Sequence, residues 1–169
     1  ACEEKPGTMA AVIGMTSDEL FDLGKEVQSL GIVQPANYNS KEQVAISGDF
    51  KAVEKAVELA KSKGKKAILL NVGGAFHSAL MISAKQNLEK ALETVKFKDA
   101  QIPVVANVTA KKVTSAPDIK YLLTDQLTKP VLWYQSLEYM YSQGVKIFVE
   151  IGPGKVLQGL VKKTLKDAV

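Results

Sequence analysis

The order of strand and helix patterns between residues 8 and 72 restricts the fold of this chain more than any other feature. Strand-like apolar runs stand at 9–15, 32–39, 43–48 and 65–72, and amphipathic helical patterns stand at 16–31 and 50–64. The first helix is expected to begin with a capping box, Thr16 with Glu19, to bury Leu30 on its apolar face and to stop at Gly31. This β-α-β-β-α-β order is that of a ferredoxin-like subdomain, in which two helices cover one face of a four-stranded antiparallel sheet.

The pattern changes after Gly73 and Gly74. We expect a long helix from Ser78 to about Val95, with a buried stripe that includes Leu88. Later strands are expected at 102–108 and 145–152, and later helices after Pro117, at 133–144 and after 152. Continuous apolar strands are typical of a parallel α/β layer, but two strands are too few for a sheet. The α/β chain is therefore expected to divide into a leading segment (1–7), the ferredoxin-like subdomain (8–72) and part of a larger α/β domain (73–169).

The basic residues are all lysines. There are 22 of them against 18 acidic residues, which gives a net charge of +4. Lysine does not reproduce the bidentate fork of arginine, so a site for a planar carboxylate would need a group from outside this chain. We interpret the lysines as solvated surface, with an anionic ligand or an acidic protein as the alternative. No nucleic-acid interface is expected, because no basic strand carries interleaved aromatic residues.

The composition favours a cytoplasmic protein. No apolar run approaches the roughly 20 residues of a membrane span, and the first residues do not resemble a signal peptide. The single cysteine, Cys2, cannot form an internal disulfide, which is typical of a reducing compartment. Because the chain lacks an initiator methionine, we expect it to begin inside a longer one.

The only histidine, His77, is the strongest candidate for chemistry. It lies in "GGAFHSALM" (73–81), between a predicted strand and a predicted helix. Small residues before it would let a ligand approach, Phe76 would wall a pocket, and helix N–H groups nearby would favour negative charge. A neutral imidazole is the usual general base near pH 7. The alternative is a structural or exposed histidine, which is the more common fate of an isolated one.

A base needs a nucleophile, and none is recognisable. The chain has ten serines but no G-x-S-x-G elbow, and Ser78 is better interpreted as a helix N-cap. Cys2 lies in a terminal stretch that looks unstructured. One histidine and one cysteine give no metal-ligand cluster, so neither a metal nor another cofactor is expected.

Two asparagines, Asn37 and Asn39, lie in "ANYNS" with the spacing of one strand face. Turn chemistry before a hairpin and a role in a pocket explain them equally well. The glycine-rich "EIGPGKVL" (150–157) fails the phosphate-loop spacing, because Val156 follows Lys155, and is interpreted as a tight turn into the last helix.

Five motifs in order resemble those of malonyl-CoA:acyl-carrier-protein transacylases. They are "ANYNSKEQVAISG", "GAFHSALM", "IPVVANVTA", "LLTDQLTKPVLWYQSLEYM" and "FVEIGPGKVLQGLVKK". The resemblance covers essentially the whole chain and corresponds to the C-terminal half to two-thirds of the family. It implies an α/β-hydrolase-like domain with an inserted ferredoxin-like subdomain.

The resemblance also implies a function. Family members move malonyl from malonyl-CoA to a serine and then to the phosphopantetheine thiol of acyl carrier protein, in fatty-acid biosynthesis. His77 matches the catalytic base, and Gln126 matches the glutamine whose main-chain carbonyl orients it. Phe76 matches the position associated with malonyl over α-branched acyl groups. As weaker matches, Asn37 and Asn39 correspond to cleft-lining residues, and Lys66 to a basic residue near CoA.

Three parts of the family's machinery have no match here. They are the nucleophile elbow, the loop that completes the oxyanion hole and the arginine that binds the malonyl carboxylate. The family places all three before the matched segment, so we expect a missing N-terminal part to carry them and this chain alone to be inactive and poorly soluble. The alternatives are a non-catalytic fragment that still binds CoA or carrier protein, and an unrelated ferredoxin-like domain with an α/β tail.

Overall fold

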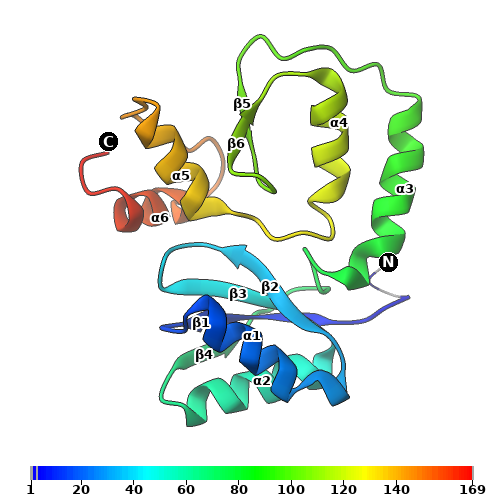
Figure 1. Cartoon of the computed structure of the whole chain (residues 1–169), viewed down its shortest axis with the longest axis vertical. Coiled ribbons are helices and arrows are strands. Elements are labelled where there is room, and N and C mark those ends of the chain that lie inside the picture. The colour runs from blue at the N-terminus through cyan, green and yellow to red at the C-terminus, as the bar shows by residue number, and fades with distance from the viewer. Residues whose placement is uncertain (1, 3, 169) are drawn as a thin grey trace.

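The computed structural model describes residue 2 and residues 4–168 and contains two units (Figure 1). The first unit is a sheet with two helices, and the second consists mainly of helices with one small hairpin. The elements of the first unit are β1 (Thr8–Ile13), α1 (Ser17–Glu26), β2 (Val33–Tyr38), β3 (Gln43–Gly48), α2 (Phe50–Ser62) and β4 (Lys66–Leu69). The β-α-β-β-α-β order predicted for residues 8–72 is therefore confirmed.

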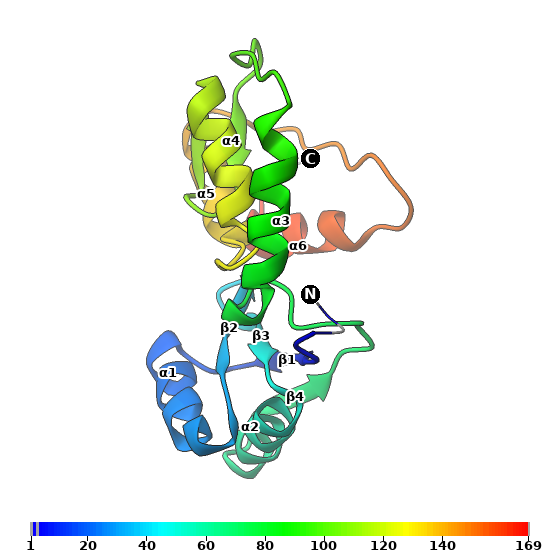
Figure 2. The ribbon, with the colours of Figure 1, turned by 90° about the vertical axis from the view of Figure 1, so that its right-hand side faces the viewer.

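The four strands form one antiparallel sheet in the order β2-β3-β1-β4. Both helices lie on the same side of it (Figures 1 and 2). The buried core consists of apolar side chains from this sheet face and from the facing stripes of α1 and α2, among them Val12, Leu23, Ile46, Val53 and Ala56. The apolar residues that recur every second position in the strands and every three or four positions in the helices meet in this core, which explains why the elements of the unit could be predicted from the sequence.

The first helix begins as predicted but ends early. Thr16 accepts a hydrogen bond from the backbone N–H of Glu19, and the Glu19 carboxylate accepts one from the backbone N–H of Thr16. The α-helix ends at Glu26, and a separate 3-10 turn covers Gln28–Leu30 before Gly31, whose φ is 135°. The predicted burial of Leu30 is wrong, because this turn leaves the side chain 45% exposed.

The second unit contains a 3-10 turn, η2 (Ala79–Met81), then α3 (Ile82–Glu93), β5 (Val104–Ala106), β6 (Lys111–Val113), α4 (Ala116–Asp125), α5 (Trp133–Ser142) and α6 (Val156–Thr164). The helices therefore lie near the predicted places. The predicted buried stripe is confirmed only at its start, where Leu80 and Met81 of η2 are buried, and it is wrong for α3, in which no residue is buried. This helix packs mainly against α4 and turns its remaining sides to solvent (Figure 2).

The two strands predicted for the second unit differ from the observed structure. Only Val104–Ala106 of the run 102–108 forms a strand, and it pairs antiparallel with the unpredicted β6. Segment 145–151 has no strand partner among the described residues, and it curves away from the helices between α5 and α6 (Figure 2). Its side chains at 147, 149 and 151 are 70%, 76% and 94% exposed. A strand needs a neighbour for its backbone groups, and no described segment supplies one here.

Strand β2 joins the two units. The backbone N–H of Tyr38 donates to the carbonyl of Val131 at 2.8 Å, and the N–H of Val131 donates to the carbonyl of Ala36 at 2.8 Å. Asn37 thereby forms a parallel bridge with Val131. The loop after α4 is held against the outer edge of the sheet, and this loop follows directly on Gln126.

Candidate active site

His77 lies between β4 and the turn η2, with φ at 57°. A non-glycine residue seldom adopts this left-handed conformation, and such residues concentrate at functional sites. The Nδ1 atom of His77 is 2.7 Å from the main-chain carbonyl oxygen of Gln126. A carbonyl only accepts, so this hydrogen bond selects the tautomer that carries its proton on Nδ1. The structure therefore brings together the two residues that the sequence singled out for catalysis.

The Gln126 carbonyl is available because of its place in the chain. Gln126 follows the last residue of α4, where carbonyl groups have no partner within the helix. Its side-chain oxygen accepts a hydrogen bond from Nδ2 of Asn107 at 3.0 Å. One residue earlier, the Asp125 carboxylate accepts a hydrogen bond from Nζ of Lys85 at 2.8 Å, with the two side chains only 10% and 18% exposed. These contacts hold the end of α4 from the turn after β5 and from α3.

The other ring nitrogen of His77 has no hydrogen-bond partner among the described residues. The adjacent Ser78 is fully buried, and its hydroxyl donates to the carbonyl of Ala75 at 2.6 Å. The same oxygen accepts from the N–H of Leu80 at 3.2 Å, so Ser78 caps the turn η2 as predicted. Both hydrogen bonds of the Ser78 hydroxyl are local, so this hydroxyl does not bind Nε2 of His77. Nε2 is therefore available to a group from outside this cluster.

The predicted substrate-binding residues are spread over the molecule. Phe76 is 42% exposed beside His77, and Asn37 lies in β2 at its bridge to Val131. Asn39 lies beyond the end of β2, in the hairpin turn, where its N–H donates to the carbonyl of Gln43. Asn39 therefore does not share a strand face with Asn37, and the turn interpretation fits its backbone.

Lys66 is distant from His77 in the sheet. Lys66 pairs with Ile13 at one end of β1. Gln34, which contacts His77, is level with the other end of β1, because Gln34 and Met9 both pair with Ser47 of β3. Four residues of strand separate the two ends, about 13 Å at the usual rise. The exposed side chain of Lys66 is thus not part of the cluster around His77.

Four residues of this cluster were missed by sequence reasoning: Gln34, Lys85, Asn107 and Asp125. Asn107 carried a weak signal, because it is a polar residue at the end of an apolar run. Cys2 was expected to lie in an unstructured stretch, but it packs against Ala75, Leu80 and Met81.

Among the described residues, no group of three or more His, Cys, Asp or Glu could hold a metal ion. No helix in this part of the chain is long and apolar enough to cross a membrane.

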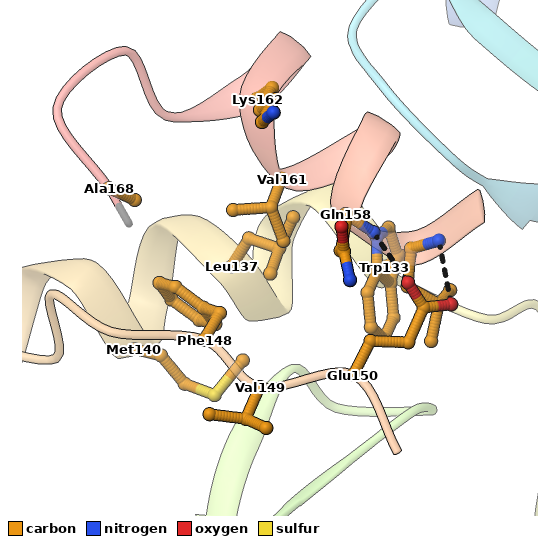
Figure 3. Close-up of a pocket in the computed structure, with 11 residues that line it drawn as sticks. Trp133, Leu137, Met140, Phe148, Val149, Glu150, Gln158, Val161, Lys162 and Ala168 are labelled. Atoms are coloured by element: carbon orange, nitrogen blue, oxygen red, sulfur yellow. Dashed lines mark hydrogen bonds between the residues drawn. The ribbon is translucent and has the colours of Figure 1, made fainter. Parts of the chain in front are cut away.

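A hollow lies in the helical unit, between α5, α6 and the segment 148–150 (Figure 3). It has a volume of about 430 Å³, and its walls are mainly apolar side chains such as Trp133, Leu137 and Phe148. Glu150 lies at its edge, where the carboxylate accepts hydrogen bonds from the backbone N–H groups of Leu157 and Gln158 at the start of α6. None of the predicted site residues lines this hollow.

The acyl transferase domain model matches residues 4–169. The chain therefore belongs to the acyl transferase domain family. Within that family its relatives are malonyl CoA-acyl carrier protein transacylases, which confirms the resemblance seen in the five motifs. The transacylase of Bacillus subtilis (strain 168) is 47% identical over 159 residues, which are 93% of this chain and 50% of the relative.

Solved structures show the same likeness. A malonyl-transacylase in complex with the holo form of a type II PKS acyl-carrier protein, AntF, is 39% identical with a TM-score of 0.93, over 99% of this chain and 55% of that one. The Streptococcus pneumoniae enzyme is 41% identical with a TM-score of 0.90, over 99% and 56%. The chain thus has the α/β fold of these structures, and it spans about half the length of the curated relatives it matches.

Proposed function

We propose that this chain supplies the histidine base and part of the substrate-binding surface of an enzyme that moves malonyl from malonyl-CoA to the phosphopantetheine thiol of an acyl carrier protein. The observation that carries the proposal is the 2.7 Å contact between Nδ1 of His77 and the carbonyl of Gln126. It leaves the lone pair of Nε2 free to take a proton. The holo carrier protein bound to a similar transacylase supports the choice of acceptor.

The chemistry follows two matched half-reactions. Nε2 of His77 takes the proton of a serine hydroxyl while the serine oxygen attacks the thioester carbonyl of malonyl-CoA. The tetrahedral intermediate collapses, the C–S bond breaks, and the leaving CoA sulfur takes the proton back from the imidazolium. In the second half-reaction His77 takes the proton of the pantetheine thiol, whose sulfur attacks the malonyl ester. The serine oxygen then leaves with that proton, so the enzyme is regenerated.

The carbonyl of Gln126 takes the place that a carboxylate has in a Ser-His-Asp triad. It accepts the Nδ1 proton, fixes the ring orientation and favours the imidazolium by its dipole, without a full negative charge. Asn107 fixes the Gln126 side chain, and the Lys85–Asp125 pair fixes the end of α4. Contacts from several elements therefore fix the carbonyl that orients His77. A fixed orientation is needed because the same base takes a proton first from the serine and then from the pantetheine thiol.

The nucleophile in this proposal is a serine outside this chain. No described serine or cysteine forms a hydrogen bond with His77, and the neighbouring Ser78 hydroxyl is buried and committed. An oxyanion hole and an arginine for the malonyl carboxylate are likewise proposed to come from the part of the relatives that this chain does not match. On this view the chain alone is inactive, and a CoA-binding or carrier-binding fragment without catalysis is the second candidate.

The substrate would lie across both units. We assign the acyl group to the side of Phe76, whose exposed ring would crowd a methyl substituent at C2 of malonyl. Asn37 is proposed to line the same cleft, and Asn39 and Lys66 stay as more distant candidates for contacts with CoA. We also propose that residues 8–72 form a ferredoxin-like subdomain and that the remaining residues belong to an α/β-hydrolase-like domain. A cytoplasmic location is part of the proposal, because the free thiol of Cys2 is typical of a reducing compartment.

Complementation tests the proposal. The unmatched half of the Bacillus subtilis transacylase is expressed separately, mixed with this chain, and assayed for malonyl transfer to holo acyl carrier protein. Transfer is expected from the mixture and from neither component alone, and it should disappear with His77→Ala. Equal transfer by the His77→Ala mixture would overturn the assignment of the base. A mixture that binds malonyl-CoA without transfer would favour the second candidate.

A further inference from the structure

We propose that Gln34 is a positioning residue that fixes His77 from the sheet unit. Its side-chain oxygen accepts a hydrogen bond from the backbone N–H of Ala79 at 3.1 Å, and its side-chain nitrogen donates to the carbonyl of His77 at 3.4 Å. The amide thus bridges the two residues on either side of the buried Ser78. The inference rests on the proposed role of His77 as a base.

The glutamine amide presents a donor and an acceptor on two separate atoms, which is the pair of groups that the bridge requires. One end of the bridge is an N–H that needs an acceptor, and the other is a carbonyl that needs a donor. The bridge closes over His77 where its backbone adopts the left-handed conformation at φ 57°. Such a conformation persists when surrounding contacts determine it, and Gln34 supplies two of those contacts from a part of the chain 43 residues away.

Gln34 lies on β2, the strand that also binds the loop after Gln126. Two residues further along the same strand, Ala36 accepts a hydrogen bond from Val131, and Tyr38 donates to the carbonyl of Val131. Val131 is five residues beyond Gln126 in the chain. A single strand therefore holds the segment that carries the base and the segment that carries its orienting carbonyl. β2 pairs with β3 on both sides of a bulge between Pro35 and Asn37, so both attachments are made from one strand of the sheet.

The single histidine makes the inference directly measurable. The two ¹⁵N shifts of His77, read at a pH above the ordinary histidine range, report which ring nitrogen carries the proton. Gln34→Met keeps the length of the side chain and removes both hydrogen bonds. We expect its ¹⁵N shifts to move away from the Nδ1–H tautomer toward averaged values, and exchange of the Ala79 amide to rise about tenfold, the factor of one ordinary hydrogen bond.

Two further variants separate positioning from general stability. Gln34→Glu keeps an acceptor for Ala79 but faces the His77 carbonyl with another acceptor, so Ala79 should stay protected while the His77 shifts move. Gln43→Met, the same change on neighbouring β3, should leave both readouts unchanged. Unchanged His77 shifts in a folded Gln34→Met protein would overturn the proposal.

The test does not depend on catalysis. The shift and exchange measurements use no acyl donor, so they would still test Gln34 if the complementation assay showed no malonyl transfer. Likewise, a negative result for Gln34 would not affect the complementation test of His77. If Gln34→Met does not fold, the Gln34→Glu shifts decide. If neither variant folds, an Ala79 amide that exchanges at the unprotected rate in the parent chain would overturn the bridge, and a protected one would support it.

Discussion

The carbonyl oxygen of Gln126 and Nδ1 of His77, 49 residues apart in the chain, lie 2.7 Å from each other. The acceptor is main chain, so the hydrogen bond itself does not require a glutamine side chain. The side chain has a separate partner in Asn107. The backbone and the side chain of Gln126 therefore make contributions that mutation can separate.

Replacing His77 should cost far more activity than replacing Gln126. In the complemented enzyme, His77→Ala is expected to lower kcat for malonyl transfer by about 10²–10⁴-fold, the usual contribution of a general base. Gln126→Ala keeps the carbonyl and should lower kcat by less than about tenfold, the factor expected when one ordinary hydrogen bond is lost. Steady-state transfer to holo acyl carrier protein checks both values. A loss in Gln126→Ala as large as that in His77→Ala would contradict the backbone role.

Asn107 and Gln126 should be energetically coupled. Asn107→Ala and Gln126→Ala each remove the same 3.0 Å hydrogen bond between Nδ2 and Oε1. The double variant should therefore lose less stability than the sum of the single losses, by about 1 kcal/mol. Urea unfolding of the four proteins measures the difference in the free energy of unfolding. Strict additivity would show that the two side chains do not interact.

Much of the sheet unit could be predicted from sequence because its signals are local and agree with one another. The capping box at Thr16, the apolar stripe of α2 and the apolar run of β3 each specify an element, and the four strands pair with one another in a single sheet. The helical unit was harder to predict. The run 102–108 and the segment 145–152 are apolar enough for buried strands, but among the described residues only 104–106 finds a partner, in β6.

The site could be predicted only where a motif carried it. His77 was singled out as the only histidine, next to a predicted helix, whereas Gln126 was found through resemblance. The distance between the two could not be predicted from their separation in the chain. Gln34, Lys85 and Asn107 were missed because their partners are 19 to 45 residues away and depend on how β2, α3 and β5 pack. Hydrogen bonds between distant elements leave no periodic trace in a sequence.

Phe76 should control the choice of acyl group. Removing the exposed ring with Phe76→Ala makes room for a methyl substituent at C2, and one methyl or methylene group is worth about 10–200-fold in specificity. The ratio of kcat/KM for methylmalonyl-CoA to that for malonyl-CoA is expected to rise at least about tenfold. Phe50→Ala, which removes a similarly exposed ring on α2, serves as the control. A ratio unchanged in Phe76→Ala would place the acyl group elsewhere.

The ion pair between Lys85 and Asp125 should stabilise the end of α4 in a pH-dependent way. The hydrogen bond to the Asp125 carboxylate raises the pKa of Lys85 above its ordinary value. A raised pKa in the folded state means that the contribution is complete below the ordinary lysine pKa and is lost as the pH rises through the folded value. Thermal unfolding between neutral and strongly alkaline pH should show a larger loss of stability in the parent chain than in Lys85→Met.

At neutral pH the same Lys85→Met variant should lose about 2 kcal/mol of unfolding free energy, because Asp125 is left nearly buried without its partner. Lys90→Met, on the exposed side of the same helix, should change the stability by less than about 0.5 kcal/mol. Equal effects of the two substitutions would show that the pair contributes nothing specific.

The central claim is that this chain supplies the base while the nucleophile comes from elsewhere. An intact mass spectrum tests it most directly, taken after malonyl-CoA is added to the chain alone and to its mixture with the unmatched half of the Bacillus subtilis transacylase. The account predicts no malonyl adduct on this chain in either sample, and one malonyl adduct on the Bacillus subtilis half that depends on His77. A covalent malonyl adduct on this chain would contradict the account, because one of its own serines or Cys2 would then be the nucleophile.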